Sequence, residues 1–425
     1  MHRRHPQIAA AVAVLAVFAA GCSNDSDTDG AAATTTAPAA TSTAAEAETW
    51  PAPTITGSTY EVPDDLSDAR PGDVLAAEAL PPTERLPGAA RHRVLYASQD
   101  RDGRTVAVSG IVLVPTGTPP EGGWPVISWG HGTTGVADVC APSLTDNLFY
   151  NEYAQEASTM LRAGYAVVAT DYLGLGTPGM HSYLVGADEG NAMVDVVTAA
   201  RHVVADLSST WFAVGHSQGG QGALFATQVA DRAPALDLAG AVSIAPASGL
   251  ELALPAITAG SAPADLAYGV YMLAGLSTVD DSFHVEDVLG SAGLAHRDVL
   301  LDDGCLLDTY SKLSADEVDK IFSMTPEQAQ QLSARIAVHG NAENEPVVGP
   351  VLVVQGQDDH DVPVQLTDLM VQRLGEKGSP VDYRTYPDLG HDTVIGPSVC
   401  DRLAWMAEHG GPAVPDCTPY DTDLS

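Results

Sequence analysis

Short apolar runs alternate with amphipathic stretches along the chain between residues 90 and 240. The predicted strands are residues 106–114, 124–129, 165–169, 211–214 and 239–245. Apolar positions recur with helical spacing between these runs, in the predicted helices 153–161, 192–205 and 218–230. Strands that alternate with helices predict βαβ units and a mostly parallel central sheet with helices on both faces.

One strand-to-helix junction carries the strongest chemical signal. The strand 211–214 leads into Gly-His-Ser-Gln-Gly-Gly at 215–220, and a helix follows at once. G-x-S-x-G in this context is typical of a nucleophile elbow, where small residues two positions from the serine let a strained turn close. The hydroxyl of Ser217 is then expected at a helix N-terminus, where free N–H groups favour negative charge. Ser217 is therefore the predicted nucleophile.

A serine nucleophile needs an orienting acid, which in α/β-hydrolases follows the serine and precedes the histidine. The predicted strand 351–354 is followed by the pattern G-x-x-D-x-x-V-P, which makes Asp359 the predicted acid. Asp358 is the alternative acid. Asp361 is interpreted as a solvated turn residue.

The general base is expected beyond the acid. The predicted strand 381–386 leads to a loop that ends in Gly-His, and its His391 is the predicted base. His360 and His409 also lie in this part of the chain. Both are interpreted as surface residues, His409 as a favourable cation at the end of a terminal helix.

Acyl transfer also needs N–H donors for the developing oxyanion. In this type of fold one donor is the residue after the nucleophile, which here is Gln218. The second donor comes from the loop after an earlier strand. The strand 124–129 is followed by Gly-His-Gly-Thr-Thr-Gly at 130–135, which points to the N–H of Thr133. A plain glycine-rich turn is the alternative interpretation of this loop.

Several segments together indicate a family. They are SWGHGTTG (128–135), CAPS (140–143), ATDYLGLGTPG (169–179), YLVG (183–186) and GHSQGG (215–220). Over residues 75–420 the chain resembles the secretory lipase family, the fungal lipase A type and its exported bacterial relatives, within the α/β-hydrolase fold. The resemblance implies carboxylic ester hydrolysis by a triad of Ser217, Asp359 and His391. It also implies the disulfides Cys140–Cys305 and Cys400–Cys417, and a helical lid inserted before the acid-bearing strand.

The spacing of the predicted triad leaves room for such a lid. Ser217 and Asp359 are 142 residues apart (359 − 217), far more than the intervening helix and strands require. Residues 247–347 have a mostly helical pattern, and 314–317 and 325–328 both fit capping boxes. The apolar stretch 250–276 suits a cover over an acyl pocket, although helices of this kind can equally be core.

The first 58 residues differ from the rest. Residues 1–21 have a basic start and an apolar run too short to span a bilayer, which predicts a signal peptide. The run ends in Ala-Ala-Gly-Cys and resembles a bacterial lipobox with Cys22 as the lipidated residue; an ordinary cleaved signal is the alternative. Residues 22–58 are rich in Ser, Thr, Ala, Asp and Pro and predict a disordered tether. The catalytic domain is then 59–425, with the lid at about 247–347.

Composition and charge narrow the class of function. The 55 acidic and 19 basic residues give a formal net charge of −36, which argues against binding nucleic acid or adsorbing to anionic lipid through a basic face. Apart from Cys22 there are four cysteines, Cys140, Cys305, Cys400 and Cys417, an even number that fits an oxidising compartment and allows three pairings. Without CxxC or HxxH spacing, a structural zinc site is not expected.

The sequence thus predicts an exported serine carboxylic ester hydrolase, a lipase or esterase of the α/β-hydrolase fold. It is expected to act as a monomer on neutral, apolar esters, without a cofactor or metal. It is expected to be secreted, or held at the outer face of a bacterial membrane by the lipid on Cys22. Two alternatives stay open: an acyltransferase with the same triad, and a catalytically silent surface binding protein on a hydrolase scaffold.

Overall fold

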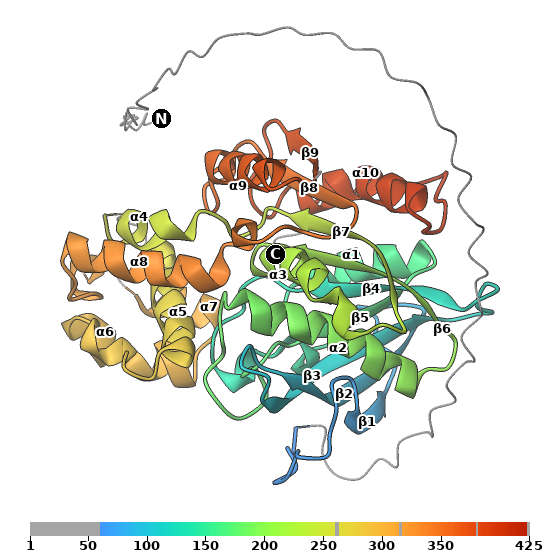
Figure 1. The fold of residues 1–425 in the computed structure, drawn as a ribbon, viewed down its shortest axis with the longest axis horizontal. Helices are drawn as coiled ribbons and strands as arrows, with labels where there is room; N and C mark the ends of the chain where they lie inside the picture. The colour runs from blue at the N-terminus through green and yellow to red at the C-terminus, as the bar shows by residue number, and fades with distance from the viewer. Residues whose placement is uncertain (1–59, 260–262, 314–316, 380, 423–425) are drawn as a thin grey trace, which may run out of the picture. The chain divides into compact units, whose positions relative to one another are not determined.

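Nine strands in the described part of the chain form one sheet (Figure 1). The structure is a computed structural model that describes residues 60–422, without 260–262, 314–316 and 380. The expected signal segment, Cys22, the whole tether and residues 314–316 of the first capping box therefore lie outside the described residues. The strands are β1 (Val74–Leu80), β2 (Ala89–Gln99), β3 (Thr105–Pro115), β4 (Trp124–Gly130), β5 (Ala166–Thr170), β6 (Leu207–His216), β7 (Asp237–Ile244), β8 (Val351–Gly356) and β9 (Val381–Tyr386).

The order of the strands brings four loops to one edge of the sheet. The order is β1-β2-β3-β5-β4-β6-β7-β8-β9, antiparallel from β1 to β5 and parallel from β5 to β9. The last residue of β4, Gly130, pairs with Gly215 near the end of β6, and Gly356 at the end of β8 pairs with Tyr386 at the end of β9. The loops after β4, β6, β8 and β9 therefore leave the sheet at the same edge.

Helices cover both faces of the sheet. They are α1 (Asn151–Arg162), α2 (Gly186–Val203), α3 (Gln218–Gln228), α9 (Val364–Glu376) and α10 (Ile395–Glu408). Neighbouring strand residues alternate between two apolar cores: Ala213 packs with α2, α3 and α9, whereas Phe212 packs with α1 and α10. This alternation explains why the central parallel strands β4, β5 and β8 are mostly apolar, since both of their faces are buried.

The predicted fold class is confirmed, and most predicted elements have a counterpart. The helix expected at 192–205 begins earlier, at Gly186, because small and acidic residues of its first turns are also buried. The antiparallel strands β1 and β2 were not predicted. The exposed positions of the edge strand β1 and the polar residues of β2, such as Arg91 and Arg93, weaken the apolar signal.

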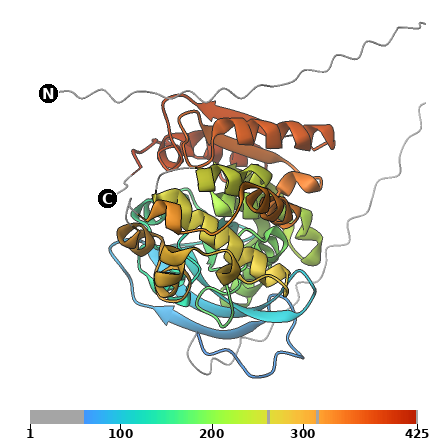
Figure 2. The same ribbon diagram turned by 90° about the vertical axis from the view of Figure 1, so that its left-hand side faces the viewer.

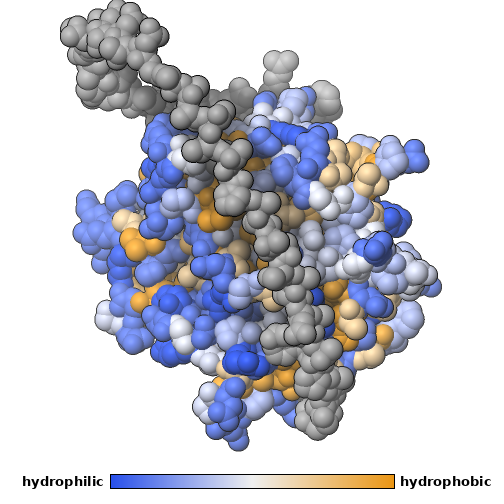
Figure 3. Space-filling model, turned by 45° about the vertical axis from the view of Figure 1, so that its right-hand side comes forward, coloured by the Kyte–Doolittle hydropathy of each residue, from blue (hydrophilic) through white to orange (hydrophobic). Residues whose placement is uncertain are grey.

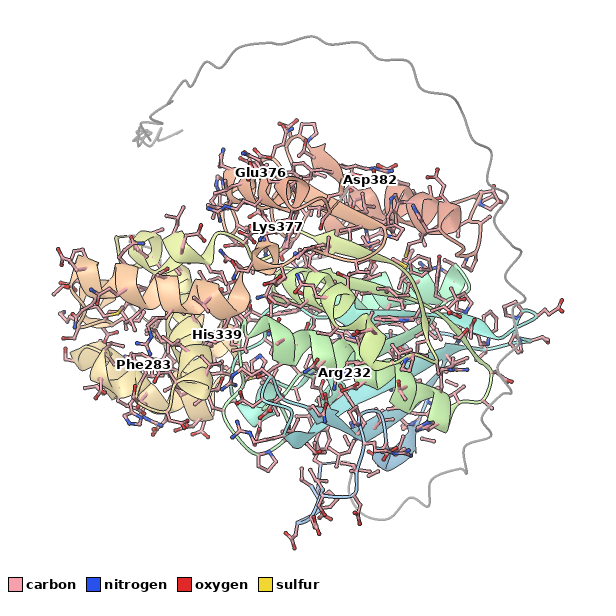
Figure 4. All side chains as sticks on the ribbon, in the orientation of Figure 1. Arg232, Phe283, His339, Glu376, Lys377 and Asp382 are labelled. Carbon is pink, nitrogen blue, oxygen red and sulfur yellow. A yellow bond between two sulfur atoms is a disulfide. The ribbon has the colours of Figure 1, made fainter. Side chains whose placement is uncertain are left out.

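A separate group of helices lies between β7 and β8 (Figure 1). It contains α4 (Ala253–Ala259), α5 (Pro263–Val279), α6 (Ser291–Ala295), α7 (Leu306–Lys312) and α8 (Pro326–Gly340). Figure 2 turns this group, coloured yellow to orange, toward the viewer. The group has its own apolar core, to which Phe283 belongs (labelled in Figure 4). We call residues 247–347 the insertion.

Local sequence explains how the insertion is held together. Helix α8 begins with the predicted capping box, in which Thr325 and Gln328 bond each other's backbone N–H and Pro326 is the first helical residue. The disulfide Cys140–Cys305 joins the start of α7 to the loop after β4, and the N–H of Leu306 donates to the carbonyl of Thr134 over 2.8 Å. The second disulfide is Cys400–Cys417. Both pairings agree with those that the family resemblance implies.

The outer surface carries most of the polar residues. On the face shown in Figure 3, hydrophilic residues predominate and apolar ones form small separate patches. Among the helices in the described ranges, we find none whose length and apolar character suffice to cross a membrane.

Two glycines under the predicted nucleophile permit the closest backbone approach at this edge of the sheet. A Cβ atom at Gly219 would lie 2.0 Å from the carbonyl oxygen of Gly130, and one at Gly215 would lie 2.1 Å from the carbonyl oxygen of Gly219. Real side chains do not tolerate such distances, so β4, β6 and α3 meet here only because these positions lack side chains.

We expect Gly219→Ala to lower the free energy of unfolding by about 1–3 kcal/mol or more, because backbone atoms have to move apart. Gly375→Ala in α9 is the matched control, since a Cβ there meets nothing within 4 Å. Alanine in a helix is favoured over glycine by up to about 1 kcal/mol, so the control should be stable or gain stability. Urea denaturation measures both, and equal stability of the two variants would contradict the steric argument.

Candidate active site

Ser217 lies at a strained turn between β6 and α3. Its backbone has φ 57° and ψ −118°, a region that residues with a side chain rarely adopt, and α3 begins at the next residue. The N–H of Ser217 donates to the carbonyl of Ile244 at the end of β7 over 2.9 Å. The turn therefore holds the hydroxyl at the carboxyl edge of the sheet, as expected for a nucleophile elbow.

The structure brings the three predicted triad residues together. His391 Nε2 lies 2.8 Å from Ser217 Oγ, and His391 Nδ1 lies 2.8 Å from Asp359 Oδ2. The ring therefore donates from Nδ1 to the carboxylate and accepts the serine proton at Nε2. Both Asp359 and His391 are buried, at 4% and 8% exposure, so water competes little for these hydrogen bonds.

Asp359 rather than Asp358 contacts the imidazole. The N–H groups of Asp361 and Val362 donate to Asp359 Oδ1 over 2.9 and 2.8 Å, and the side chain of Gln355 in β8 donates to Oδ2 over 2.7 Å. Burial raises the pKa of Asp359, but the hydrogen bond and charge of His391 and these N–H donors hold it below its usual value. The side chain of Asp358 is exposed to solvent.

Three carboxylates surround the imidazole of His391. Besides Asp359, the carboxylates of Asp361 and Asp392 lie near it: each forms, with His391 and one further residue, a group whose polar atoms are all within 4.8 Å. Burial alone would lower the pKa of His391, but the hydrogen bond and charge of Asp359, with the charges of Asp392 and Asp361, raise it to about 9. The field at the ring thus favours the imidazolium form.

The loop after β4 approaches the serine closely. A Cβ atom at Gly132 would lie 2.3 Å from the hydroxyl of Tyr153 and 3.3 Å from the Cβ of Ser217, so a side chain here would displace Tyr153. Thr133, the predicted donor, is held by both its polar groups: its hydroxyl lies 2.6 Å from the hydroxyl of Tyr183, and its carbonyl accepts from Tyr150 over 2.8 Å. Within the described residues, no hydrogen bond occupies the N–H of Thr133 or that of Gln218.

Tyr153 of α1 links three loops of the site. Its hydroxyl accepts from the N–H of Gly132 over 2.9 Å and lies 3.0 Å from His216 Nδ1, while His216 Nε2 lies 3.1 Å from the carbonyl of His391. A carbonyl only accepts, so His216 carries its proton on Nε2, and Tyr153 donates to Nδ1. The loop of Gly132, the elbow and the loop of His391 are thereby connected through one tyrosine.

The side chain of Gln218 lies in a buried polar cluster. Its Nε2 donates to His181 Nε2 and to Glu189 Oε1, both over 2.9 Å. Burial raises the pKa of Glu189 to about 8 and lowers the pKa of His181 to about 3. These contacts hold the first residue of α3 in place directly after Ser217.

A cavity of about 380 Å³ opens on Ser217 and His391. Aromatic rings line it from two sides, and they belong to Phe149, Tyr150, Tyr153, Tyr268 and Tyr310. Tyr268 and Tyr310, with Leu306 and Leu307, come from α5 and α7 of the insertion. Asp361 lines this cavity as well, so its interpretation as a purely solvated turn residue was incomplete.

Two groups of side chains have a spacing that could suit a metal ion. They are His216, His391 and Asp392, and Asp359, Asp361 and His391. Both include His391, whose two nitrogens already contact Asp359 and Ser217. A metal ion in either group would have to replace one of these hydrogen bonds.

Comparison with known protein families finds one match to this chain. A family model described as serine aminopeptidase, S33, matches residues 149–397, more than half of the chain. A search of curated proteins finds no match.

Solved structures with a similar fold come from yeast and bacteria. Lipase A of Candida antarctica in its closed state is 20% identical, with a TM-score of 0.70 over 85% of this chain and 89% of that one. The rice cell wall degrading esterase LipA of Xanthomonas oryzae is also 20% identical, with a TM-score of 0.64 over 75% and 92%. A putative hydrolase of Legionella pneumophila is 18% identical, with a TM-score of 0.66 over 81% and 99%.

We expect Tyr153→Phe to destabilise the protein by about 1–3 kcal/mol, because it leaves the buried N–H of Gly132 and the Nδ1 of His216 without a partner. Tyr383→Phe is the control, since Tyr383 donates to Asp368 in an exposed hydrogen bond and its loss should change stability by less than about 0.5 kcal/mol. Urea denaturation measures both. If both variants unfold at the wild-type midpoint, the link through Tyr153 contributes nothing to stability.

Proposed function

Since the chain belongs to the serine aminopeptidase S33 family of α/β-hydrolases, we propose that it is an exported carboxylic ester hydrolase that acts through an acyl-enzyme on Ser217. The hydrogen-bonded chain from Ser217 through His391 to Asp359 carries this proposal. The segments that resemble secretory lipases support an ester rather than a peptide bond as the substrate. So does the similarity in fold to a lipase and an esterase.

The proposed reaction has two steps. His391 takes the proton of Ser217 as the serine oxygen attacks the ester carbonyl, and Asp359 holds the imidazole in the required tautomer and stabilises its charge. The N–H groups of Thr133 and Gln218 stabilise the oxyanion. His391 then protonates the leaving alcohol, and water attacks the acyl-enzyme with His391 again as base.

The insertion supplies the proposed cover of the substrate site. Tyr268, Leu306, Leu307 and Tyr310 contribute apolar and aromatic surface to the cavity. A cavity of this size and lining suits the apolar part of a small ester. We therefore assign the insertion the role of a lid.

The disulfides support the proposed export. Structural disulfides persist in oxidising compartments and are rare in the cytosol. Both Cys140–Cys305 and Cys400–Cys417 fit the expectation of a chain that carries an export signal at residues 1–21. Attachment of the mature protein through Cys22 is part of the same proposal.

Replacing the nucleophile gives the most direct test. We expect Ser217→Ala to reduce hydrolysis of p-nitrophenyl acetate on the order of a million-fold, because the acyl-enzyme cannot form. A fluorophosphonate probe should label the wild type but not this variant. Ser209→Ala, whose hydroxyl contacts only the exposed Asp237, is the control and should keep full activity.

Each competing function has its own outcome in this experiment. Labelling of Ser217 without turnover of any ester would favour a binding protein. Transfer of the acetyl group to an added alcohol in preference to water would favour an acyltransferase. Faster turnover of aminoacyl p-nitroanilides than of esters would favour a peptidase.

The charges around His391 predict an alkaline pH profile. Only the neutral imidazole can accept the serine proton, and the pKa of His391 in the folded protein is raised to about 9. We therefore expect kcat/KM for a neutral ester to rise with pH, with a midpoint near 9, and to be low at pH 6. Asp392→Asn removes one of the negative charges and should move the midpoint to lower pH.

The control is Asp416→Asn, which removes an equal charge at an exposed position of the C-terminal segment. It should leave the midpoint unchanged. A wild-type midpoint near 6.5, the ordinary histidine value, would contradict the proposed influence of the carboxylates.

A further inference from the structure

The cavity at Ser217 combines aromatic rings with carboxylates. Besides the five aromatic residues described above, Asp361 and Asp392 line it, and none of the described lining residues is a lysine or arginine. A cavity that binds only the apolar part of a neutral ester gains nothing from carboxylates in its lining, because partial desolvation of a charge is unfavourable. The combination is instead what binds an ammonium group, which is attracted to ring faces and to carboxylates.

The carboxylates lie on the side of His391. Asp361 and Asp392 each belong to a group of polar atoms within 4.8 Å that includes the imidazole, and Asp392 Oδ1 is 3.8 Å from His216 Nε2. Among the described residues Asp361 forms no salt bridge with a lysine or arginine, and the basic group beside it is the imidazole of His391. Partial desolvation raises the pKa of Asp361, the charge of His391 opposes this effect, and the charges of Asp392 and Asp359 add to it.

Aromatic rings stand close to these carboxylates. Tyr268 and Tyr310, with ring centroids 6.5 Å apart, come from α5 and α7, and the charge of Asp361 acts on the hydroxyls of both. On the α1 side, Tyr150 and Tyr153 pack edge to face with their centroids 5.3 Å apart. A cation in this cavity would therefore meet rings from the insertion and from the central domain, with carboxylates beside them.

The position of Asp361 and Asp392 relative to His391 indicates which half of a bound ester would carry the positive charge. The base that takes the serine proton later donates it to the leaving alcohol, so the alcohol part lies on the imidazole side of the scissile bond. Because Asp361 and Asp392 flank the imidazole, they face the alcohol and not the acyl group. We infer that the enzyme is selective for esters of amino alcohols, whose alcohol part carries a quaternary or protonated ammonium group; this inference rests on the proposed ester hydrolysis.

The charge of the bound ester should also affect the protonation of His391. An ammonium group beside Asp361 and Asp392 offsets the charges that favour the imidazolium form of His391. His391 should therefore lose its proton at a lower pH when a cationic ester is bound than when a neutral ester is bound. Hydrolysis itself stays balanced: the ester and water give the carboxylic acid and the free amino alcohol.

An isosteric pair of esters tests the inference. Choline acetate and 3,3-dimethylbutyl acetate have the same shape and differ in a charged nitrogen against a neutral carbon. We expect the wild-type enzyme to have a kcat/KM about 10–100-fold higher for choline acetate, from the cation–π and ionic contacts together. The midpoint of the pH profile of kcat should be lower for choline acetate than for its neutral isostere. Acid release is measured by pH-stat titration, and the rate found with the Ser217→Ala variant is subtracted as background.

Matched variants separate the carboxylates of the cavity from the overall charge. Asp361→Asn and Asp392→Asn should each lower the ratio of the two kcat/KM values by about tenfold, chiefly through choline acetate. Asp358→Asn removes an equal charge from the same loop as Asp361, but its exposed side chain does not line the cavity. It should keep the wild-type ratio. Tetramethylammonium chloride should inhibit the neutral ester more than sodium chloride at equal concentration.

The outcomes distinguish this inference from the proposed function. Equal kcat/KM for the two esters, or an equal loss of the ratio in Asp358→Asn, overturns the inference and leaves ester hydrolysis in place. Turnover of p-nitrophenyl acetate without turnover of choline acetate also overturns it. If the wild type hydrolyses none of the three esters, the proposed function itself is wrong.

Discussion

The contact between bare backbones beneath Ser217 is the constraint on which the site depends. Gly130, Gly215 and Gly219 allow β4, β6 and the first turn of α3 to approach more closely than any side chain permits. This approach sets the strained φ of Ser217, and it brings the loop after β4 beside the serine. The position of the proposed oxyanion donors thus follows from the same packing that exposes Ser217, the proposed nucleophile, so neither could change alone.

A second constraint is electrostatic. The imidazole of His391 is buried, which alone would keep it neutral, but three carboxylates oppose this effect and dominate it. Such a balance is sensitive to any further charge that enters the cavity. In the proposed mechanism, the charge of the substrate therefore affects the protonation of His391 as well as binding.

The sequence predicted the parts of the site that depend on local pattern. Ser217 is marked by glycines on either side within a strand–turn–helix segment, and Asp359 and His391 each follow a predicted strand at a typical spacing. Tyr153 carries no such mark, because its partners Gly132 and His216 are 21 and 63 positions away. The same holds for the cavity position of Asp361 and for the raised pKa of His391, since both arise from elements that meet only in the folded chain.

The disulfide Cys140–Cys305 closes a ring of chain that contains α1, Ser217 and the first part of the insertion. A single proteolytic cut anywhere inside this ring leaves the two fragments covalently joined. The α7 segment beside Cys305 stays attached to the loop after β4 even when the helices before it are severed. The protein can therefore be cut once in this region without coming apart, which would favour its survival if it is exported as proposed.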